Sequence, residues 1–166
     1  TPIKSSAASD VYKRQWEIES RYDLVIGNPP FSKLKEKNEK IIQALKENVN
    51  QKTNNLAALF LEKCIRNSDC VALVLNKNIL ETAEYADTRE ILRTIKIDTI
   101  IDFGRYGFTG VSIETMCLIV YPKQKPKNTS IYNMKYNRRY TKEQKYITDK
   151  RYPYFLIYLS LIHISE

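Results

Sequence analysis

The sequence is poor in several residue types, and each shortage excludes a class of protein. Only four glycines occur in 166 residues, and none lies before Gly27. They form neither the G-x-G-x-x-G spacing of a dinucleotide-binding loop nor the Gly-Lys-Ser/Thr ending of a P-loop. Three cysteines without a C-x-x-C pair provide neither a disulfide framework nor a zinc site, so no metal is expected and a reducing compartment such as the cytosol fits best. No apolar run approaches the roughly 18–20 residues of a membrane span.

Positive charge is present in excess, and the excess is confined to one segment. The chain has 27 Lys and Arg against 19 Asp and Glu, which gives a net charge of +8 at pH 7. Residues 123–151 contain 10 of these basic residues and 2 of the acidic ones, so the rest of the chain is nearly neutral. Such a segment attracts polyanions but adds little to fold specificity.

Both ends of the chain are expected to be foreign to the protein. Residues 5–15 (SSAASDVYKRQ) and the last eight residues (LSLIHISE) resemble translated sequencing-adapter sequence, as found at the ends of reading frames from metagenomic reads. The alternative is an ordinary disordered N-terminus and a final strand. We therefore predict non-native segments at 1–15 and 159–166, and His163, the only histidine, receives no role.

Between these ends, short apolar runs alternate with amphipathic patterns. We predict strands at 24–26, 71–75, 97–103 and 116–121, and helices at 33–50 and 54–67. A further helix through Ile91 and Leu92 is expected to begin with a capping box formed by Asp87 and Glu90. Because the strands are apolar on both faces, the pattern indicates a buried α/β sheet with helices on its faces.

The amino-acid composition changes after residue 122. A lysine-rich linker is followed by tyrosines among basic residues, so we predict one unit at 16–122 and the start of a different module at 123–158. Lysines neutralise phosphates and aromatic rings stack on bases, so this segment is a candidate for nucleic-acid binding. A solvated linker followed by core tyrosines is an equal alternative. The candidate DNA-binding residues are Lys123, Lys125, Lys127, Arg138 and Arg139.

The strongest local signal is Asn28-Pro29-Pro30-Phe31, directly after the first predicted strand. The two prolines carry no backbone N–H, so strand pairing must stop there, and Pro30 forces Pro29 into an extended conformation. The Pro29 carbonyl and the Asn28 side chain then provide two acceptors for an exocyclic amino group, and Phe31 provides a ring for stacking. Ligands of open α/β sheets bind beyond the carboxyl ends of strands, which is where this tetrad lies. Asp102, at another strand end, could face the same cleft.

The residues 22–31 (YDLVIGNPPF) resemble motif IV of S-adenosylmethionine-dependent amino-methyltransferases. The most similar subset is the adenine-N6 DNA methyltransferases of restriction–modification systems. The similarity continues in order downstream, through the helix and strand at 55–80, the segment from Tyr85 to Leu92, the strand at 97–104, and a motif VIII-like run at 108–115 with its strand.

The resemblance implies an α/β fold, namely the C-terminal half of a Rossmann-like methyltransferase sheet. It implies S-adenosylmethionine as the cofactor, double-stranded DNA as the partner, and methyl transfer to the N6 amino group of a flipped adenine. Asn28 and Pro29 would accept hydrogen bonds from that amino group, Pro30 would complete the catalytic tip, and Phe31 and Phe108 would stack on the base. In this family the glycine-rich cofactor loop precedes motif IV. We therefore expect a fragment without the cofactor half, inactive alone, and we assign no cofactor-binding residues.

Other functions remain open at this stage. Methyltransferases that act on guanine-N2 of ribosomal RNA or on protein glutamine use a similar tetrad, although Phe31 and the basic segment favour DNA. A target-recognition domain follows motif VIII in the family, so 123–158 would be the linker and the start of that region. A non-catalytic nucleic-acid-binding module would keep the basic segment and treat Asn28–Phe31 as a turn. We expect a cytoplasmic protein of bacterial or phage origin.

Overall fold

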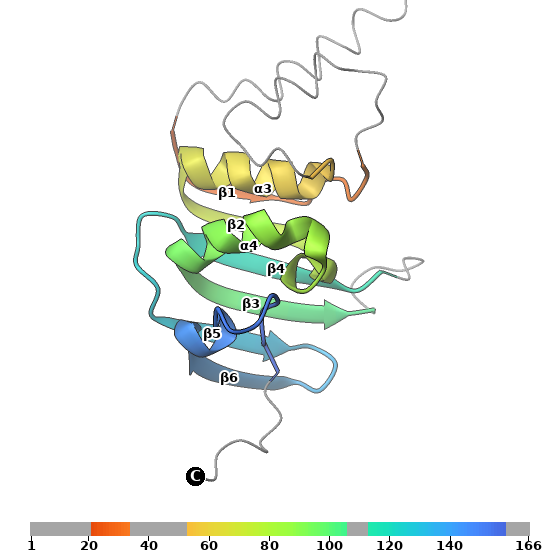
Figure 1. The fold of residues 1–166 in the computed structure, drawn as a ribbon, viewed down its shortest axis with the longest axis vertical. Helices are drawn as coiled ribbons and strands as arrows, with labels where there is room; N and C mark the ends of the chain where they lie inside the picture. The colour runs from red at the N-terminus through yellow and green to blue at the C-terminus, as the bar shows by residue number, and fades with distance from the viewer. Residues whose placement is uncertain (1–20, 34–52, 106–112, 159–166) are drawn as a thin grey trace, which may run out of the picture.

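A computed structural model describes residues 21–33, 53–105 and 113–158, which form a mixed α/β structure (Figure 1). The strands are β1 (Tyr22–Gly27), β2 (Ser68–Asn76), β3 (Lys96–Gly104), β4 (Thr115–Tyr121), β5 (Asn128–Asn133) and β6 (Arg138–Glu143). The helices are α3 (Leu56–Asn67), α4 (Ala86–Thr94) and α5 (Gln144–Ile147), with short 3-10 turns η1 (Lys77–Leu80) and η2 (Ala83–Tyr85). The helix predicted at 33–50 and the two chain ends lie outside the described residues.

The six strands form one sheet in the order β1-β2-β4-β3-β5-β6. β1 pairs with β2 in parallel and β3 pairs with β5 in parallel, whereas β4 is antiparallel to both of its neighbours. The carboxyl ends of β1, β2, β3 and β5 therefore lie along one edge of the sheet, together with the beginning of β4. We call this side the carboxyl edge and the opposite side the amino edge.

The hydrophobic core lies between the sheet and the helices. Alternate residues of the central strands are fully buried, among them Val71, Leu73 and Leu75 of β2 and Leu118 of β4, and they pack on α3 and α4. All described helices lie on the same face of the sheet (Figure 1). The prediction of helices on both faces is therefore seen for one face only within the described residues. On the other face the intervening strand residues are only half-buried.

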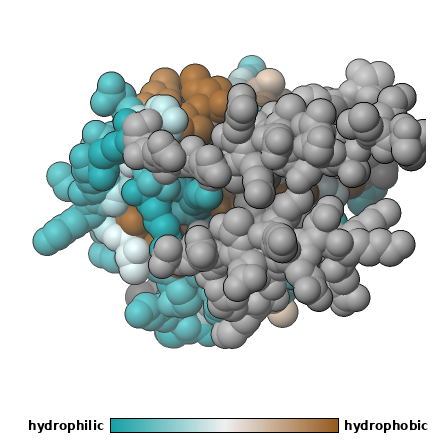
Figure 2. All heavy atoms as spheres, turned by 90° about the horizontal axis from the view of Figure 1, so that it is seen from above, coloured by the Kyte–Doolittle hydropathy of each residue, from teal (hydrophilic) through white to brown (hydrophobic). Residues whose placement is uncertain are grey.

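The first strand forms where it was predicted, but the described residues do not bury it. Ile26 is 74% exposed and Leu24 is 50% exposed. The reason is positional, because β1 is the end strand of the described sheet and its side chains on the helix-free face have no described neighbours to cover them. Figure 2 shows apolar surface at the end of the molecule where β1 and α3 lie.

The segment after residue 122 continues the same sheet. β5 pairs with β3 and so extends the same sheet, and β6 pairs with β5. Ile131, Ile147, Phe155 and Ile157 belong to the same buried cluster as the central strands. The sequence did not indicate this continuity with the sheet, because the segment is rich in tyrosine and lysine and its few apolar residues point inward. The assignment of 123–158 to the start of a target-recognition region stays a prediction.

The start of α4 also differs from the prediction. The residue before the helix is Tyr85, and it makes no side-chain capping bond. Asp87 lies inside the first turn rather than at the cap, where its negative charge is favourable next to the helix dipole. The preceding η2 turn supplies the local geometry, which spacing alone does not reveal.

Gln144 holds the other end of α4. Its side chain is fully buried, accepts a hydrogen bond from the Ile97 N–H at 2.8 Å, and donates to the carbonyls of Ile95 at 2.8 Å and Leu92 at 3.3 Å. It thereby satisfies backbone groups where α4 ends and β3 begins.

Replacing Gln144 with Leu keeps the approximate volume but leaves these backbone groups without partners. We expect a loss of about 2–4 kcal/mol in the free energy of unfolding, measured by urea denaturation. Gln124 is exposed, so Gln124→Leu is the matched control and should change stability by less than about 0.5 kcal/mol. Equal effects of the two substitutions would contradict this role.

None of the helices in residues 21–33, 53–105 and 113–158 combines the length and apolar character that crossing a bilayer requires.

Candidate active site at the carboxyl edge

Asn28-Pro29-Pro30-Phe31 follows β1 at the carboxyl edge. Asn28 is exposed, Pro29 is buried, and Pro30 is exposed. Phe31 is half-buried and packs against the core cluster, so its ring is neither sealed inside nor free in solvent. Among the described residues, no group forms a hydrogen bond with the Asn28 side chain. The tetrad therefore presents an open amide beside a partly exposed ring.

The backbone around the tetrad is held on both sides. At Gly27, an added Cβ would lie 3.3 Å from the Leu73 side chain, so β1 and β2 approach closely there. Beyond Phe31, the Ser32 carbonyl accepts a hydrogen bond from the Leu56 N–H at 3.0 Å. Lys33 forms an isolated bridge with Asn55, which caps α3. These contacts fix the path of the chain on each side of the tetrad.

A second polar group lies further along the same edge, around Asp102 at the end of β3. This carboxyl group is 3% exposed. It accepts hydrogen bonds from the Lys77 ammonium at 2.8 Å, from the Tyr158 hydroxyl, and from the Gly104 N–H at 2.8 Å. Lys77 also contacts Glu114 at 3.2 Å, so one cation lies between two carboxylates.

These contacts decide the charge states of the group. Burial alone would raise the pKa of Asp102, but the hydrogen bonds from Lys77, Tyr158 and the Gly104 N–H outweigh it and lower that pKa below its usual range. Burial would lower the pKa of Lys77, yet its bonds to Asp102 and Glu114 raise it. Burial and the adjacent Asp102 raise the pKa of Tyr158. Asp102 is thus a carboxylate, and Lys77 an ammonium, at neutral pH.

The lowered pKa of Asp102 gives a signed prediction for stability. A group whose pKa is lower in the folded state stabilises the fold above its unfolded pKa, about 4, and this contribution is lost as pH falls through the folded pKa. Asp102→Asn should therefore destabilise the protein more at pH 7 than at pH 3, measured by urea denaturation at both values. A difference between wild type and variant that stays constant over this range would contradict it.

The Asp102 group forms the inner wall of a pocket of about 380 Å³. We call it the hairpin pocket, since the turn between β5 and β6 closes one side of it. Its lining residues are Lys77, Asp102, Gly104, Arg105, Glu114, Asn133, Lys135, Tyr136 and Tyr158. The sequence singled out Asp102 in this set, and it marked Lys135, Tyr136 and Tyr158 only as part of the basic, tyrosine-rich segment. Tyr158 comes from the far end of the described chain, so no local pattern could have placed it here.

The structure separates the predicted DNA-binding residues into two groups. Arg138 and Arg139 pair with Asn133 and Tyr132 in the β5–β6 ladder, at the carboxyl edge. Lys123, Lys125 and Lys127 lie between the end of β4 and the start of β5, at the amino edge. Lys123 forms an ion pair there with Asp69 at 2.9 Å. Phe108 lies outside the described residues.

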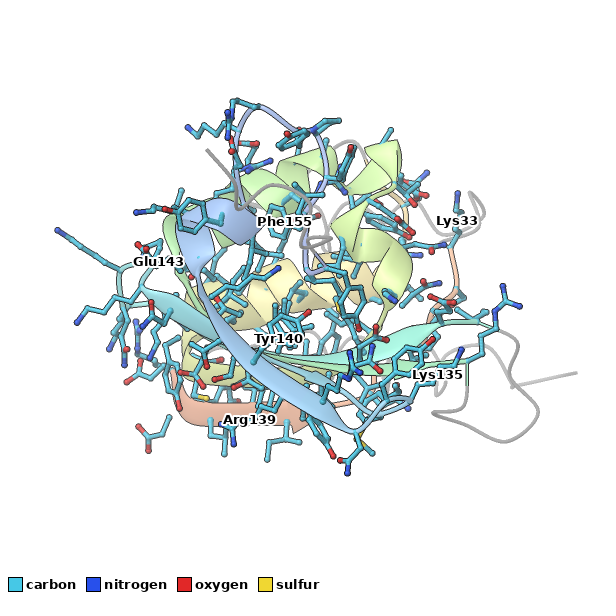
Figure 3. All side chains as sticks on the ribbon, turned by 90° about the horizontal axis from the view of Figure 1, so that it is seen from below. Lys33, Lys135, Arg139, Tyr140, Glu143 and Phe155 are labelled. Carbon is cyan, nitrogen blue, oxygen red and sulfur yellow. The ribbon has the colours of Figure 1, made fainter. Side chains whose placement is uncertain are left out.

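Figure 3 shows the two ends of the strands and the two faces of the sheet. Lys33, near the tetrad, and Lys135, on the hairpin, lie toward one end of the strands, whereas Glu143 lies toward the other. Arg139 lies on the side of the sheet away from the helices, and Tyr140 and Phe155 lie on the helix side. The tetrad and the hairpin pocket therefore share an edge, and the three lysines do not.

The fold is that of S-adenosylmethionine-dependent methyltransferases. One similar solved structure is a modification subunit assigned to a type I restriction enzyme from Vibrio vulnificus, with a TM-score of 0.58 and 20% identity over 73% of this chain and 27% of that one. A second is the M protein of the type I restriction enzyme EcoKI, with a TM-score of 0.52 and 18% identity over 78% of this chain and 27% of that one. A third is a protein from Listeria monocytogenes assigned to the class I S-adenosylmethionine-dependent methyltransferases, with a TM-score of 0.55 and 16% identity over 69% of this chain and 37% of that one. Comparison with curated proteins gives no match.

Residues 3–108 match the model of the Eco57I restriction-modification methylase family, and the chain belongs to that family. S-adenosylmethionine is the cofactor of the class to which this fold belongs. The chain spans 27% to 37% of the length of the three solved structures.

The described residues do not themselves form a site for that cofactor. A nucleotide-like cofactor needs a close backbone approach, which a glycine-rich turn after a strand provides. Within the described ranges the only such turn residue is Gly104, at φ +59°, and it faces the Asp102 group.

Proposed function

We propose that this chain provides the acceptor site of a DNA methyltransferase that modifies the N6 amino group of adenine. The observation that carries the proposal is the tetrad Asn28-Pro29-Pro30-Phe31 at the carboxyl end of β1, with Asn28 exposed and Phe31 half-buried, in a chain of the restriction-modification methylase family. Open α/β sheets bind ligands beyond the carboxyl ends of their strands, and the tetrad lies there.

The chemistry follows from what the tetrad offers to a planar amine. The Asn28 side-chain oxygen and the Pro29 carbonyl accept the two hydrogens of the N6 amino group. This arrangement withdraws the nitrogen lone pair from the ring and directs it outward, so catalysis rests on positioning and hydrogen bonding. Pro30 keeps Pro29 extended, and Phe31 stacks on the base together with Phe108. S-adenosylmethionine, when bound, supplies the methyl group.

The partner in this proposal is double-stranded DNA with the target adenine turned out of the helix. Arg138 and Arg139 are at the same edge as the tetrad and are suited to contact backbone phosphates. Lys123, Lys125 and Lys127 lie at the amino edge, so we leave them out of this interface. The substrate DNA is that of a bacterial or phage-infected cell, and the three free thiols suit a reducing cytoplasm.

The experiment expresses the complete protein in a host without adenine methylation and measures modified nucleosides in its DNA by mass spectrometry. We expect N6-methyladenine. If ribosomal RNA guanine or protein glutamine is methylated and no N6-methyladenine is found, the proposed DNA substrate is wrong, and the acceptor is another planar amine. DNA binding with no methylation of any acceptor would favour a non-catalytic binding module.

A further inference from the structure

We propose that the hairpin pocket binds one nucleotide of the DNA strand, with the phosphate held at its rim and the base against its aromatic wall, at a distance from the flipped adenine. The proposal rests on the proposed function, because it takes DNA as the ligand. It assigns a second nucleotide contact to residues outside the tetrad.

The rim of the pocket offers positive charge. The Arg105 side chain is 74% exposed and forms an ion pair with Glu114 at 3.6 Å. Lys135 forms no ion pair with any described residue, and its ammonium lies 5.1 Å from the Tyr136 ring centre. Lys135, without a described ion pair, and Arg105, largely exposed and held by one ion pair, lie on two sides of one pocket and are suited to a phosphate.

The walls of the pocket offer the groups that a base requires. Tyr136 is 62% exposed, and its ring, over which the Lys135 ammonium lies, is suited to stack on a base. The Asn133 side chain donates to the Tyr158 hydroxyl at 2.7 Å and accepts from the Tyr136 N–H at 3.1 Å. Glu114, partly exposed, adds carboxylate oxygens. A volume of about 380 Å³ is within the usual range for a small-ligand pocket.

The pocket floor is fixed before any ligand binds. Asp102 is buried and accepts from Lys77, Tyr158 and the Gly104 N–H, which joins the ends of β2 and β3 to the far end of the described chain. Asn133 extends the same network to β5. A preformed site loses little conformational entropy on binding, which favours a ligand-binding role for the residues above it.

The position fits a nucleotide away from the target. From β1 to β3 there are three strand spacings, and from β1 to β5 there are four, which places the pocket about 14–19 Å from the tetrad along the edge. At about 3.4 Å of helix rise per nucleotide, this corresponds to about 4–6 nucleotides. One duplex lying along the carboxyl edge can therefore reach both sites.

The first test removes the two rim charges. We expect Arg105→Gln/Lys135→Gln in the complete protein to weaken duplex binding by about tenfold at 0.15 M salt and to reduce the slope of log K against log salt by about 2, measured by fluorescence anisotropy. The matched control is Arg66→Gln/Lys145→Gln, which removes one Arg and one Lys from exposed positions toward the amino edge. Equal effects of the two double substitutions would overturn the proposal.

The second test concerns the base. Tyr136→Leu removes the ring and no charge, so we expect weaker binding with an unchanged salt slope, and unchanged stability by urea denaturation. The same phosphate and base could also come from a free mononucleotide, so AMP is tested as a second ligand. If AMP binds to the pocket and duplex binding does not depend on these residues, the DNA assignment is wrong. Binding and methylation are measured separately. Loss of N6-methyladenine with intact rim-dependent binding contradicts the proposed function alone, and rim-independent binding with intact methylation contradicts the pocket alone.

Discussion

Asn28→Ala should reduce the rate of adenine methylation by at least about 10²–10³-fold in the complete protein. The substitution removes the oxygen that accepts a hydrogen from the amino group, and with it the interaction that orients the lone pair. The effect should appear in kcat, measured by transfer of a labelled methyl group to duplex DNA. The KM for DNA should change little, because duplex binding relies mainly on phosphate contacts.

The controls for this prediction separate chemistry from folding. Asn28 is exposed and has no described hydrogen-bond partner, so its replacement should alter the free energy of unfolding by less than about 0.5 kcal/mol. Asn78 is also exposed and lies at the carboxyl edge in η1, so Asn78→Ala should keep nearly full activity. Asn28→Asp keeps an oxygen acceptor and should lose less activity than Asn28→Ala. Full activity of Asn28→Ala would show that Asn28 is not the hydrogen-bond acceptor for the amino group.

Arg89→Met should destabilise the protein by about 3–5 kcal/mol, the largest stability effect that we expect from a single substitution. Arg89 is 1% exposed, and its guanidinium donates to the backbone carbonyls of Ile79 at 2.9 Å, Thr82 at 2.8 Å and Pro153 at 2.9 Å. Methionine fills part of the space but donates no hydrogen bond. Three carbonyls, two in the connection between β2 and α4 and one near the end of the described chain, would then lose this donor.

The measurement is urea denaturation, with Arg66→Met as the exposed control, for which we expect a change below about 0.5 kcal/mol. Hydrogen exchange provides an independent check. Arg89 is one of the residues that hold the segment containing Phe155 on α4, and the Phe155 N–H itself donates to Leu80 at 2.8 Å. Protection of residues 152–157 should fall in Arg89→Met and not in Arg66→Met. Equal stability of the two variants would refute the structural role.

Local patterns were sufficient to predict most elements. The apolar run Val71–Leu75 lies within β2, the run at 97–103 lies within β3, and α3 covers nearly the predicted range. These elements are strongly periodic, and their own side chains provide most of the signal. The motif order from residue 22 to residue 121 indicated the methyltransferase fold and its family, both of which are confirmed. The roles of Asn28, Pro29, Pro30, Phe31 and Phe108 stay predictions.

Features that depend on distant partners were not visible in the sequence. The roles of Lys123, Lys125, Lys127, Arg138 and Arg139 stay predictions, and the structure shows that β5 carries the three lysines and the two arginines to opposite edges. The capping box at Asp87 failed because η2 fixes the start of α4. The sequence placed Arg89 within the methyltransferase-like segment from Tyr85 to Leu92 but did not predict its burial. Its acceptors are the carbonyls of Pro153, which is far away in the sequence, and of Ile79, which lies in a short 3-10 turn.

The sequence by itself determined the open tip after β1, because two adjacent prolines stop strand pairing whatever surrounds them. It also determined the periodic strands and helices around that tip. Only the tertiary structure decided that residues after 122 extend the same sheet, and that Lys77, Asp102 and Tyr158 meet at its carboxyl edge. The physical reason is that strand order and burial of charge depend on contacts between segments far apart in the chain, which no local pattern encodes.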